Sequence, residues 1–298
     1  MFTWLAQILH SEFLNSAPVQ TALLVGSGTA VVSGVIGVFT ILRGQAFAGH
    51  ALGDISSAGG SASFLLNISP LAGFLGVAAI AAVGMEFLGV RKIREQDIAT
   101  GIVWGAGLGL SALLLYFDIT VSSTPGAAVT VMFGSIFALS PDLVWPSLIV
   151  AAINLATIAL LYRPMLLSVA DTELAAMRGI SIRWVGILQL LTLAAASALG
   201  CLTVGSLLAT ALLLGPAAAA LHLCRKPGVA IFWAVVLGLL AVWVSIWLAY
   251  ESYYWFSKPW TVSFFVSAIV LMIYLLSVSC RYAFRKFAAA RAADNAGS

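Results

Sequence analysis

Charged residues are scarce in this chain of 298 residues. Lys and Arg number 14 and Asp and Glu number 11, which together make 8% of the sequence, whereas soluble domains average about 25%. So little charge excludes a soluble enzyme, which needs a polar surface, and a disordered protein. It also excludes a nucleic-acid partner, because so small an excess of basic residues cannot form a surface that tracks phosphates.

Motifs for nucleotide hydrolysis and thiol chemistry are missing as well. No stretch has the form G-x-x-x-x-G-K-[ST] of a phosphate-binding loop, so any ATP hydrolysis would need a separate subunit. The three cysteines, Cys201, Cys224 and Cys280, have neither the spacing of a disulfide framework nor that of a zinc finger. We therefore expect three free thiols, no enzymatic activity and no permanently bound cofactor.

Hydrophobic residues, by contrast, make up 62% of the chain, and the mean hydropathy is +1.08. The apolar runs are long and continuous, which favours helices over the short alternating strands of a membrane β-barrel. A spanning helix needs about 20 mostly apolar residues. The sequence therefore predicts an all-α integral membrane protein, a polytopic bundle of eight or nine transmembrane helices, with spans near 18–42, 46–66, 69–90, 98–117, 143–161, 184–204, 205–223, 229–250 and 260–280.

Basic residues gather on one side of the predicted spans. Of the 14 Lys and Arg residues, 13 follow an odd-numbered span and only Lys258 does not. Cytoplasmic loops collect Lys and Arg, so the pattern predicts an N-terminus outside and a C-terminus inside. We expect one transmembrane domain over residues 1–298, with an interfacial segment at 1–17, a cytoplasmic loop at 162–183 and a cytoplasmic tail at 281–298.

The second span, 46–66, carries the unusual chemistry. It consists mostly of Ala, Gly and Ser, so it is expected to run through the middle of the bundle rather than against lipid. His50 and Asp54 are four residues apart and share one helix face, which Ser57 and Ser61 continue. Asp54 follows Arg43 by about 16 Å of helix, which places it near the middle of the bilayer. Ionisable residues at that depth usually mark an ion or substrate path.

Three interpretations of the His50–Asp54 pair remain open. The pair could serve packing only, relay protons, or line a path for a metal ion, for which imidazole with carboxylate suits zinc, manganese or iron(II). The third interpretation makes His50 and Asp54 metal ligands, with Ser57 and Ser61 along the pathway. One His and one Asp form only half a site. A two-fold dimer with this span near its axis would supply four ligands.

A capped helix is predicted in the loop between the fifth and sixth spans. Asp171 can cap its start, Glu173 falls in its first turn, and Gly179 is placed to end it. A short helix on the cytoplasmic face would suit docking to a partner protein. The alternative is a simple connector.

Four stretches of the chain carry a family resemblance. They are GVFTILRGQAFAGHALGDISSAG at 37–59, RKIREQDIATGIVWGAGLGL at 91–110, MFGSIFALSPDLV at 132–144, and DTELAAMRGI at 171–180 together with LLATALLLGPAAAA at 207–220. With them, the chain resembles the permease subunits of ABC transporters that import zinc, manganese or iron. The resemblance implies a bacterial inner membrane with its lipid, a second copy of the chain, cytoplasmic ATP-binding subunits and an extracytoplasmic metal-binding protein.

The resemblance also implies roles for individual residues. In the family, an Asp followed four residues later by a His on the second helix contributes to the metal path. Here His50 comes first and Asp54 follows, so the order is reversed. The DTELAAMRGI stretch is similar to the family's coupling helix, which implies contacts with the ATP-binding subunit at Asp171, Glu173, Ala176 and Gly179.

The expected function is therefore that of the permease subunit of an ATP-driven importer of zinc, manganese or iron, which passes the ion between two copies by alternating access. One alternative is a proton-coupled secondary transporter in which Asp54 titrates. Another is an ABC permease for a larger metal chelate such as a siderophore or cobalamin. A His–Asp pair argues against the chelate, because a large ligand needs a wide and mostly uncharged passage.

Overall fold

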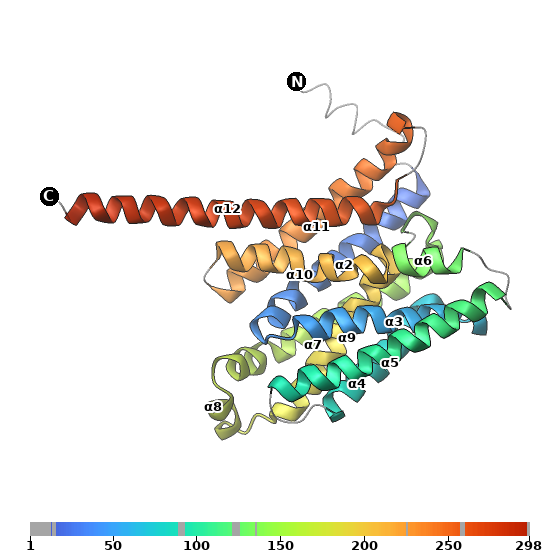
Figure 1. Cartoon of the computed structure of the whole chain (residues 1–298), viewed down its shortest axis with the longest axis horizontal. Coiled ribbons are helices and arrows are strands. Elements are labelled where there is room, and N and C mark those ends of the chain that lie inside the picture. The colour runs from blue at the N-terminus through green and yellow to red at the C-terminus, as the bar shows by residue number, and fades with distance from the viewer. Residues whose placement is uncertain are drawn as a thin grey trace.

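The structure is a computed structural model that describes Phe13 and residues 16–88, 93–120, 126–134, 136–224, 226–256 and 260–296 (Figure 1). The described residues form helices and no strand. Nine helices are long: α2 (Ala17–Leu42), α3 (Ala46–Leu66), α4 (Pro70–Leu88), α5 (Ile93–Thr120), α7 (Val144–Ala170), α9 (Ile182–Val204), α10 (Ser206–Leu223), α11 (Pro227–Phe256) and α12 (Val262–Ala296). Each predicted span corresponds to one of them, so the all-α membrane fold is confirmed.

Eight of the long helices are apolar enough, as well as long enough, to cross a membrane, and α3 lies outside this set. Its 21 residues suffice for a span, but Gly, Ser, His and Asp lower its hydropathy. Fourteen of those 21 residues are buried within the protein. The prediction that this segment runs inside the bundle is therefore confirmed, and burial among other helices explains how so polar a helix is accommodated.

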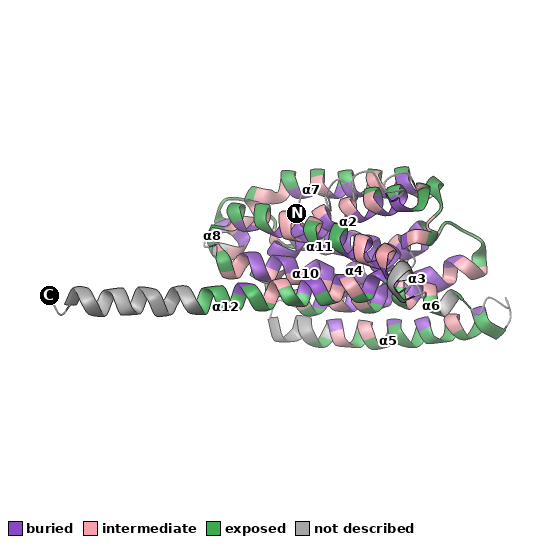
Figure 2. Ribbon diagram, turned by 90° about the horizontal axis from the view of Figure 1, so that it is seen from above, coloured by how far each residue is buried: buried purple, intermediate pink, exposed green. Residues whose placement is uncertain are grey.

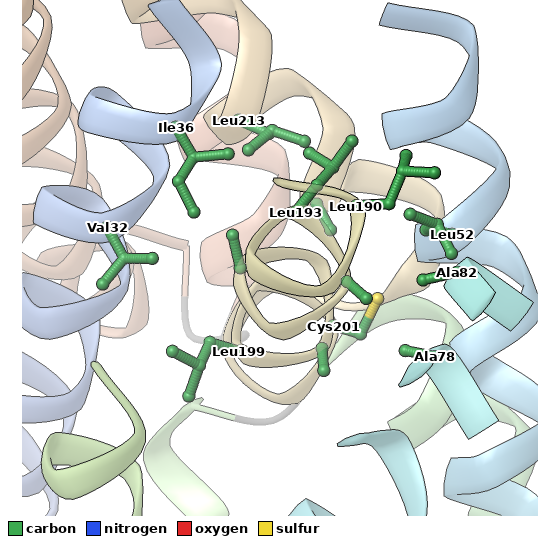
Figure 3. Packing of buried hydrophobic residues seen from close by; sticks show 14 of the residues in the cluster. Val32, Ile36, Leu52, Ala78, Ala82, Leu190, Leu193, Leu199, Cys201 and Leu213 are labelled. Atoms are coloured by element: carbon green, nitrogen blue, oxygen red, sulfur yellow. The ribbon is translucent and has the colours of Figure 1, made fainter. Parts of the chain in front are cut away.

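Helix α9 forms the centre of the larger packing cluster (Figure 3). Its apolar side chains, among them Leu193 and Leu199, face α2 on one side and α3 and α4 on the other. Leu52 of α3 and Ala82 of α4 point toward it, and both are buried. Helix α3 is thus enclosed by α4, α5, α9 and α10, which holds its polar face at a fixed position in the bundle.

Two glycines allow α3 and α4 to cross at backbone contact distance. A Cβ atom added to Gly59 would overlap the carbonyl group of Gly73, and one added to Gly73 would overlap the carbonyl group of Gly59 and lie 2.9 Å from the Cβ of Ser63. Small residues at such crossings permit the dense packing on which helix association in membranes depends. The Gly59–Gly73 contact therefore sets the spacing of this helix pair.

A second cluster joins α2, α10, α11 and α12, whose buried side chains include Leu212, Val242, Ile246 and Val266. In Figure 1 these helices lie together on one side of the α3–α4–α5 group. Helix α5 forms an edge of the bundle and is largely exposed over residues 100–120 (Figure 2). An exposed apolar helix of this kind must contact lipid or another protein chain.

The predicted cytoplasmic loop and tail are shorter than expected, because the helices before them extend further along the chain. Helix α7 continues through Pro164 to Ala170, so the segment expected as a loop at 162–183 is reduced to residues 171–181, which contain α8 (Thr172–Met177). The predicted tail at 281–298 continues α12 as helix to Ala296. Most of the interfacial segment at 1–17 lies outside the described residues, although Phe13 packs edge-to-face on Tyr250. Short helices α6 (Ala127–Phe133), η1 (Ile136–Ala138) and η2 (Pro141–Leu143) precede α7.

Candidate metal site and docking helix

Helix α3 brings His50 and Asp54 together. The two residues are one turn apart, and Nε2 of His50 lies 3.5 Å from Oδ2 of Asp54. Successive turns of a helix place residues at i and i+4 on the same face, so the contact follows directly from the sequence spacing. The predicted pair is therefore present as a geometric unit.

Side chains from two further helices hold this pair. Thr210 of α10 contacts the imidazole, with 3.0 Å between its Oγ1 and Nδ1 of His50. Trp104 of α5 donates its indole N–H to Oδ2 of Asp54 at 3.0 Å, and its ring centroid lies 5.8 Å from that of His50. Because Thr210 occupies Nδ1, Nε2 is the imidazole nitrogen turned toward Asp54. Such outer partners orient ligands and fix the ring nitrogen that faces a metal.

The two candidate ligands differ in how far their side chains are buried. The Asp54 side chain is 9% exposed, and its Oδ1 has no hydrogen-bond partner among the described residues. The His50 side chain is 40% exposed. A buried carboxylate oxygen without a partner is costly, and a cation would satisfy it. The described residues contain no cluster of three or more His, Cys, Asp or Glu side chains that could hold a metal, so one chain provides two such ligands at this position.

The two serines of the predicted pathway are buried. Ser57 Oγ contacts Oγ of Ser111 on α5 at 2.6 Å and also donates to the carbonyl oxygen of Asp54. Ser61 Oγ is buried and has no hydrogen-bond partner among the described residues. Both side chains are buried within one copy of the protein. Their role along a pathway stays a prediction.

Sequence reasoning did not identify Trp104 or Thr210 as parts of the site. Both lie in quoted stretches, RKIREQDIATGIVWGAGLGL and LLATALLLGPAAAA, but each is the kind of residue that ordinary packing uses. The available signal was a polar group, an indole N–H or a hydroxyl, in an otherwise apolar span. Such groups usually find a hydrogen-bond partner when they are removed from water, and Asp54 and His50 are the unusual polar residues nearby.

Helix α8 has the predicted caps. The Asp171 carboxylate accepts hydrogen bonds from the backbone N–H groups of Glu173, at 2.9 Å, and Leu174, at 3.0 Å. Gly179 has a φ of +78°, a left-handed conformation that glycine adopts without steric cost and that ends helices. The four predicted coupling residues, Asp171, Glu173, Ala176 and Gly179, are all exposed.

Two apolar side chains complete the exposed face of α8. Met177 is 85% exposed and Leu174 is 41% exposed, whereas Ala175 is fully buried against the protein. The buried alanine anchors the helix, and the outward Met and Leu leave apolar surface uncovered beside exposed polar residues. Exposed apolar groups with a polar rim are typical of protein interaction sites.

Comparisons with known proteins agree with this architecture. The sequence profile described as the ABC 3 transport family matches residues 15–284. The manganese transport system membrane protein MntC of Listeria monocytogenes is 31% identical over 233 residues, which are 78% of this chain and 81% of that protein. The high-affinity zinc uptake system membrane protein ZnuB of Haemophilus influenzae is 27% identical over 225 residues, 74% of this chain and 84% of that protein.

A solved structure shares the fold. PsaBC from Streptococcus pneumoniae in complex with Fab contains a chain that superposes with a TM-score of 0.78 at 23% identity. The superposition covers 92% of this chain and 95% of the other. The arrangement of helices described above is therefore one that the chain of a solved structure also adopts.

Proposed function

Because the chain belongs to the ABC 3 transport family, whose members are membrane permease subunits of ABC importers, we propose that it is the permease of an ATP-driven importer of Mn²⁺ or Zn²⁺. The observation that carries this proposal is the buried carboxylate of Asp54 in a membrane-spanning bundle. Its Oδ2 lies 3.5 Å from an imidazole nitrogen, and its Oδ1 has no hydrogen-bond partner in the part of the chain that the structure describes. Such a pair suits a divalent cation. Relatives named for manganese and zinc transport support this cargo.

The proposed site is completed by a second copy of the chain. One chain contributes His50 and Asp54, and two-fold symmetry doubles these ligands to four. The partly exposed imidazole and the largely exposed edge formed by α5 support this assembly, because both would be covered by a neighbouring copy. A closed site of four mixed ligands would bind a cation, while the absence of thiolates would let it leave.

Transport would follow from alternating access between the two sides of the membrane. The basic ends of the helices lie in the cytoplasm in this proposal, with the N-terminus outside and α12 ending inside. A metal-binding protein delivers the ion from outside, and ATP-binding subunits dock on α8 at Asp171, Glu173, Ala176 and Gly179. The permease itself makes and breaks no covalent bond. Its contribution is to hold the ion between two copies and to open toward one side at a time.

Uptake in liposomes tests the proposed function. The permease is reconstituted with its ATP-binding subunit and its binding protein, and accumulation of Mn²⁺ and Zn²⁺ is measured with ATP or with a nonhydrolysable analogue. We expect accumulation of at least one of the two ions only with ATP. Uptake driven by a pH gradient in the absence of the ATP-binding subunit would instead favour a proton-coupled transporter and overturn the proposal.

Replacement of the exposed methionine of α8 tests the docking surface. Met177→Glu is expected to weaken binding of the ATP-binding subunit at least about tenfold, because a charge in an apolar contact must be desolvated without a partner. The measurement is a titration of the ATP-binding subunit onto the solubilised permease. Met177→Leu is the matched control and should retain binding. Equal affinity of the Met177→Glu variant and the unsubstituted permease would contradict docking on α8.

A further inference from the structure

A second polar cluster lies at the end of the bundle where α2 gives way to α3. The Arg43 guanidinium donates through Nη1 to the side-chain oxygen of Gln189 and through Nη2 to Oγ of Ser168 at 2.9 Å. Gln189 in turn donates through Nε2 to Oε1 of Gln45 at 3.0 Å. Ser168 and Gln189 are buried. These four side chains, which we call the Arg43 cluster, form a continuous hydrogen-bonded chain.

The Arg43 cluster joins the two functional elements of the chain. Ser168 is in the last turn of α7, three residues before Asp171, which caps the docking helix α8. Gln45 is the residue from which α3 begins, five residues before His50. Arg43 and Gln45 flank Gly44, whose φ of +70° makes the turn between α2 and α3. Gln189 of the central helix α9 bridges the two ends.

Removing the charged guanidinium of the Arg43 cluster from water costs free energy. Burial lowers the pKa of the Arg43 guanidinium below its usual value, and the nearby Glu86 carboxylate offsets part of this effect. Apolar side chains of similar volume often stabilise a protein as well as a buried ionic group does. A guanidinium, however, can hold several acceptors from different helices in one fixed fork. Arg43 holds two acceptors in this way, Ser168 of α7 and Gln189 of α9, and Gln189 in turn donates to Gln45 at the start of α3.

We propose that Arg43 is a positioning residue that transmits movement of α8 to the helix carrying His50 and Asp54. This inference rests on the proposed function of the chain as an ATP-driven permease. A displacement of α8 moves the end of α7 and with it Ser168, because α8 follows α7 at the Asp171 cap without an intervening loop. The guanidinium fork passes this displacement to α9 and to the α2–α3 turn, which sets the position of α3.

The test separates coupling from stability. Arg43→Met removes the hydrogen-bonding fork and keeps an unbranched side chain. In liposomes with the full complex, uptake of Mn²⁺ and ATP hydrolysis are measured together. We expect the Mn²⁺ transported per ATP to fall about fivefold while ATP hydrolysis continues, which is the size of a typical coupling effect. Arg163→Met, which changes an exposed arginine of α7, is the matched control and should leave the ratio unchanged.

A purely structural role for Arg43 gives a different result. It would lower the yield of folded complex and reduce transport and hydrolysis in proportion, with an unchanged ratio, and that outcome overturns the inference. Ser168→Ala removes one bond of the cluster next to α8 and serves as the second variant. If Arg43→Met does not assemble, a lowered ratio in Ser168→Ala supports the inference and an unchanged ratio overturns it.

The two proposals fail in distinguishable ways. Failure of the proposed function appears as no ATP-dependent uptake of Mn²⁺ or Zn²⁺ by the unsubstituted complex. Failure of the Arg43 inference appears as a normal ratio of Mn²⁺ to ATP in the variants of an unsubstituted complex that is itself active. If Zn²⁺ is the ion taken up, the same ratio is measured with Zn²⁺.

Discussion

Replacing Asp54 by asparagine is expected to lower Mn²⁺ and Zn²⁺ uptake at least about 100-fold. Loss of an outer partner of a metal ligand already costs about 10–100-fold, and this change removes the charge of the ligand itself. Asparagine keeps the shape of the side chain and an oxygen that can accept from Trp104, whose N–H lies 3.0 Å from Oδ2 of Asp54. The helix packing should therefore be unaffected, and the permease should still assemble with its ATP-binding subunit.

Three further variants accompany this experiment, and two of them are controls. Glu251→Gln removes a carboxylate from α11, outside the candidate site, and should leave uptake unchanged. His50→Ala removes the other candidate ligand and should lower uptake as strongly as Asp54→Asn does. His222→Ala changes a histidine of α10 that contacts Arg281 instead, and it is the control that should leave uptake unchanged. The measurement is initial uptake rate together with co-purification of the ATP-binding subunit. Uptake at the unsubstituted rate by Asp54→Asn would remove Asp54 from the metal path.

A methyl group added at the α3–α4 crossing is expected to destabilise the permease strongly. In Gly59→Ala, the new Cβ atom would overlap the backbone carbonyl of Gly73, which a side-chain rotation cannot relieve. Overpacking typically costs about 1–3 kcal/mol, and a rigid backbone contact belongs at the upper end. The thermal midpoint of the purified protein should fall by about 6 °C or more.

Helix α4 itself offers the matched control for this substitution. An added Cβ atom at Gly76 meets no atom within 4 Å, and alanine has the higher helix propensity. Gly76→Ala should therefore leave the thermal midpoint unchanged or raise it slightly. The midpoints are measured by size-exclusion chromatography after heating. Equal stability of the Gly59→Ala and Gly76→Ala proteins would show that the close crossing of α3 and α4 is not needed.

Local patterns in the sequence predicted the elements well. Apolar runs of about 20 residues located the spans because a membrane requires each helix to satisfy its own backbone hydrogen bonds. The small residues of α3 predicted its interior position, and the spacing of His50 and Asp54 predicted their contact. The capping pattern of α8 was also local: Asp171 and Gly179 act within one short helix.

Helix ends were harder to predict than helix centres. The fifth span was predicted to end near residue 161, but α7 continues through Pro164 to Ala170. A proline removes a single backbone hydrogen bond from a helix, and the adjoining turns can compensate when neighbouring helices pack against them. The length of the connector to α9 therefore depended on packing rather than on residue type.

The sequence by itself determined the membrane class, the approximate positions of the long helices, the ionisable pair on α3 and the capped helix α8. Only the tertiary structure decided which side chains hold that pair, namely Trp104 and Thr210, and which residues link the end of α7 to the start of α3 through Arg43. The physical reason is the distance along the sequence over which each interaction acts. Hydropathy, caps and i, i+4 spacing act within one helix, whereas these contacts join residues 50 to 160 positions apart whose meeting depends on how helices pack.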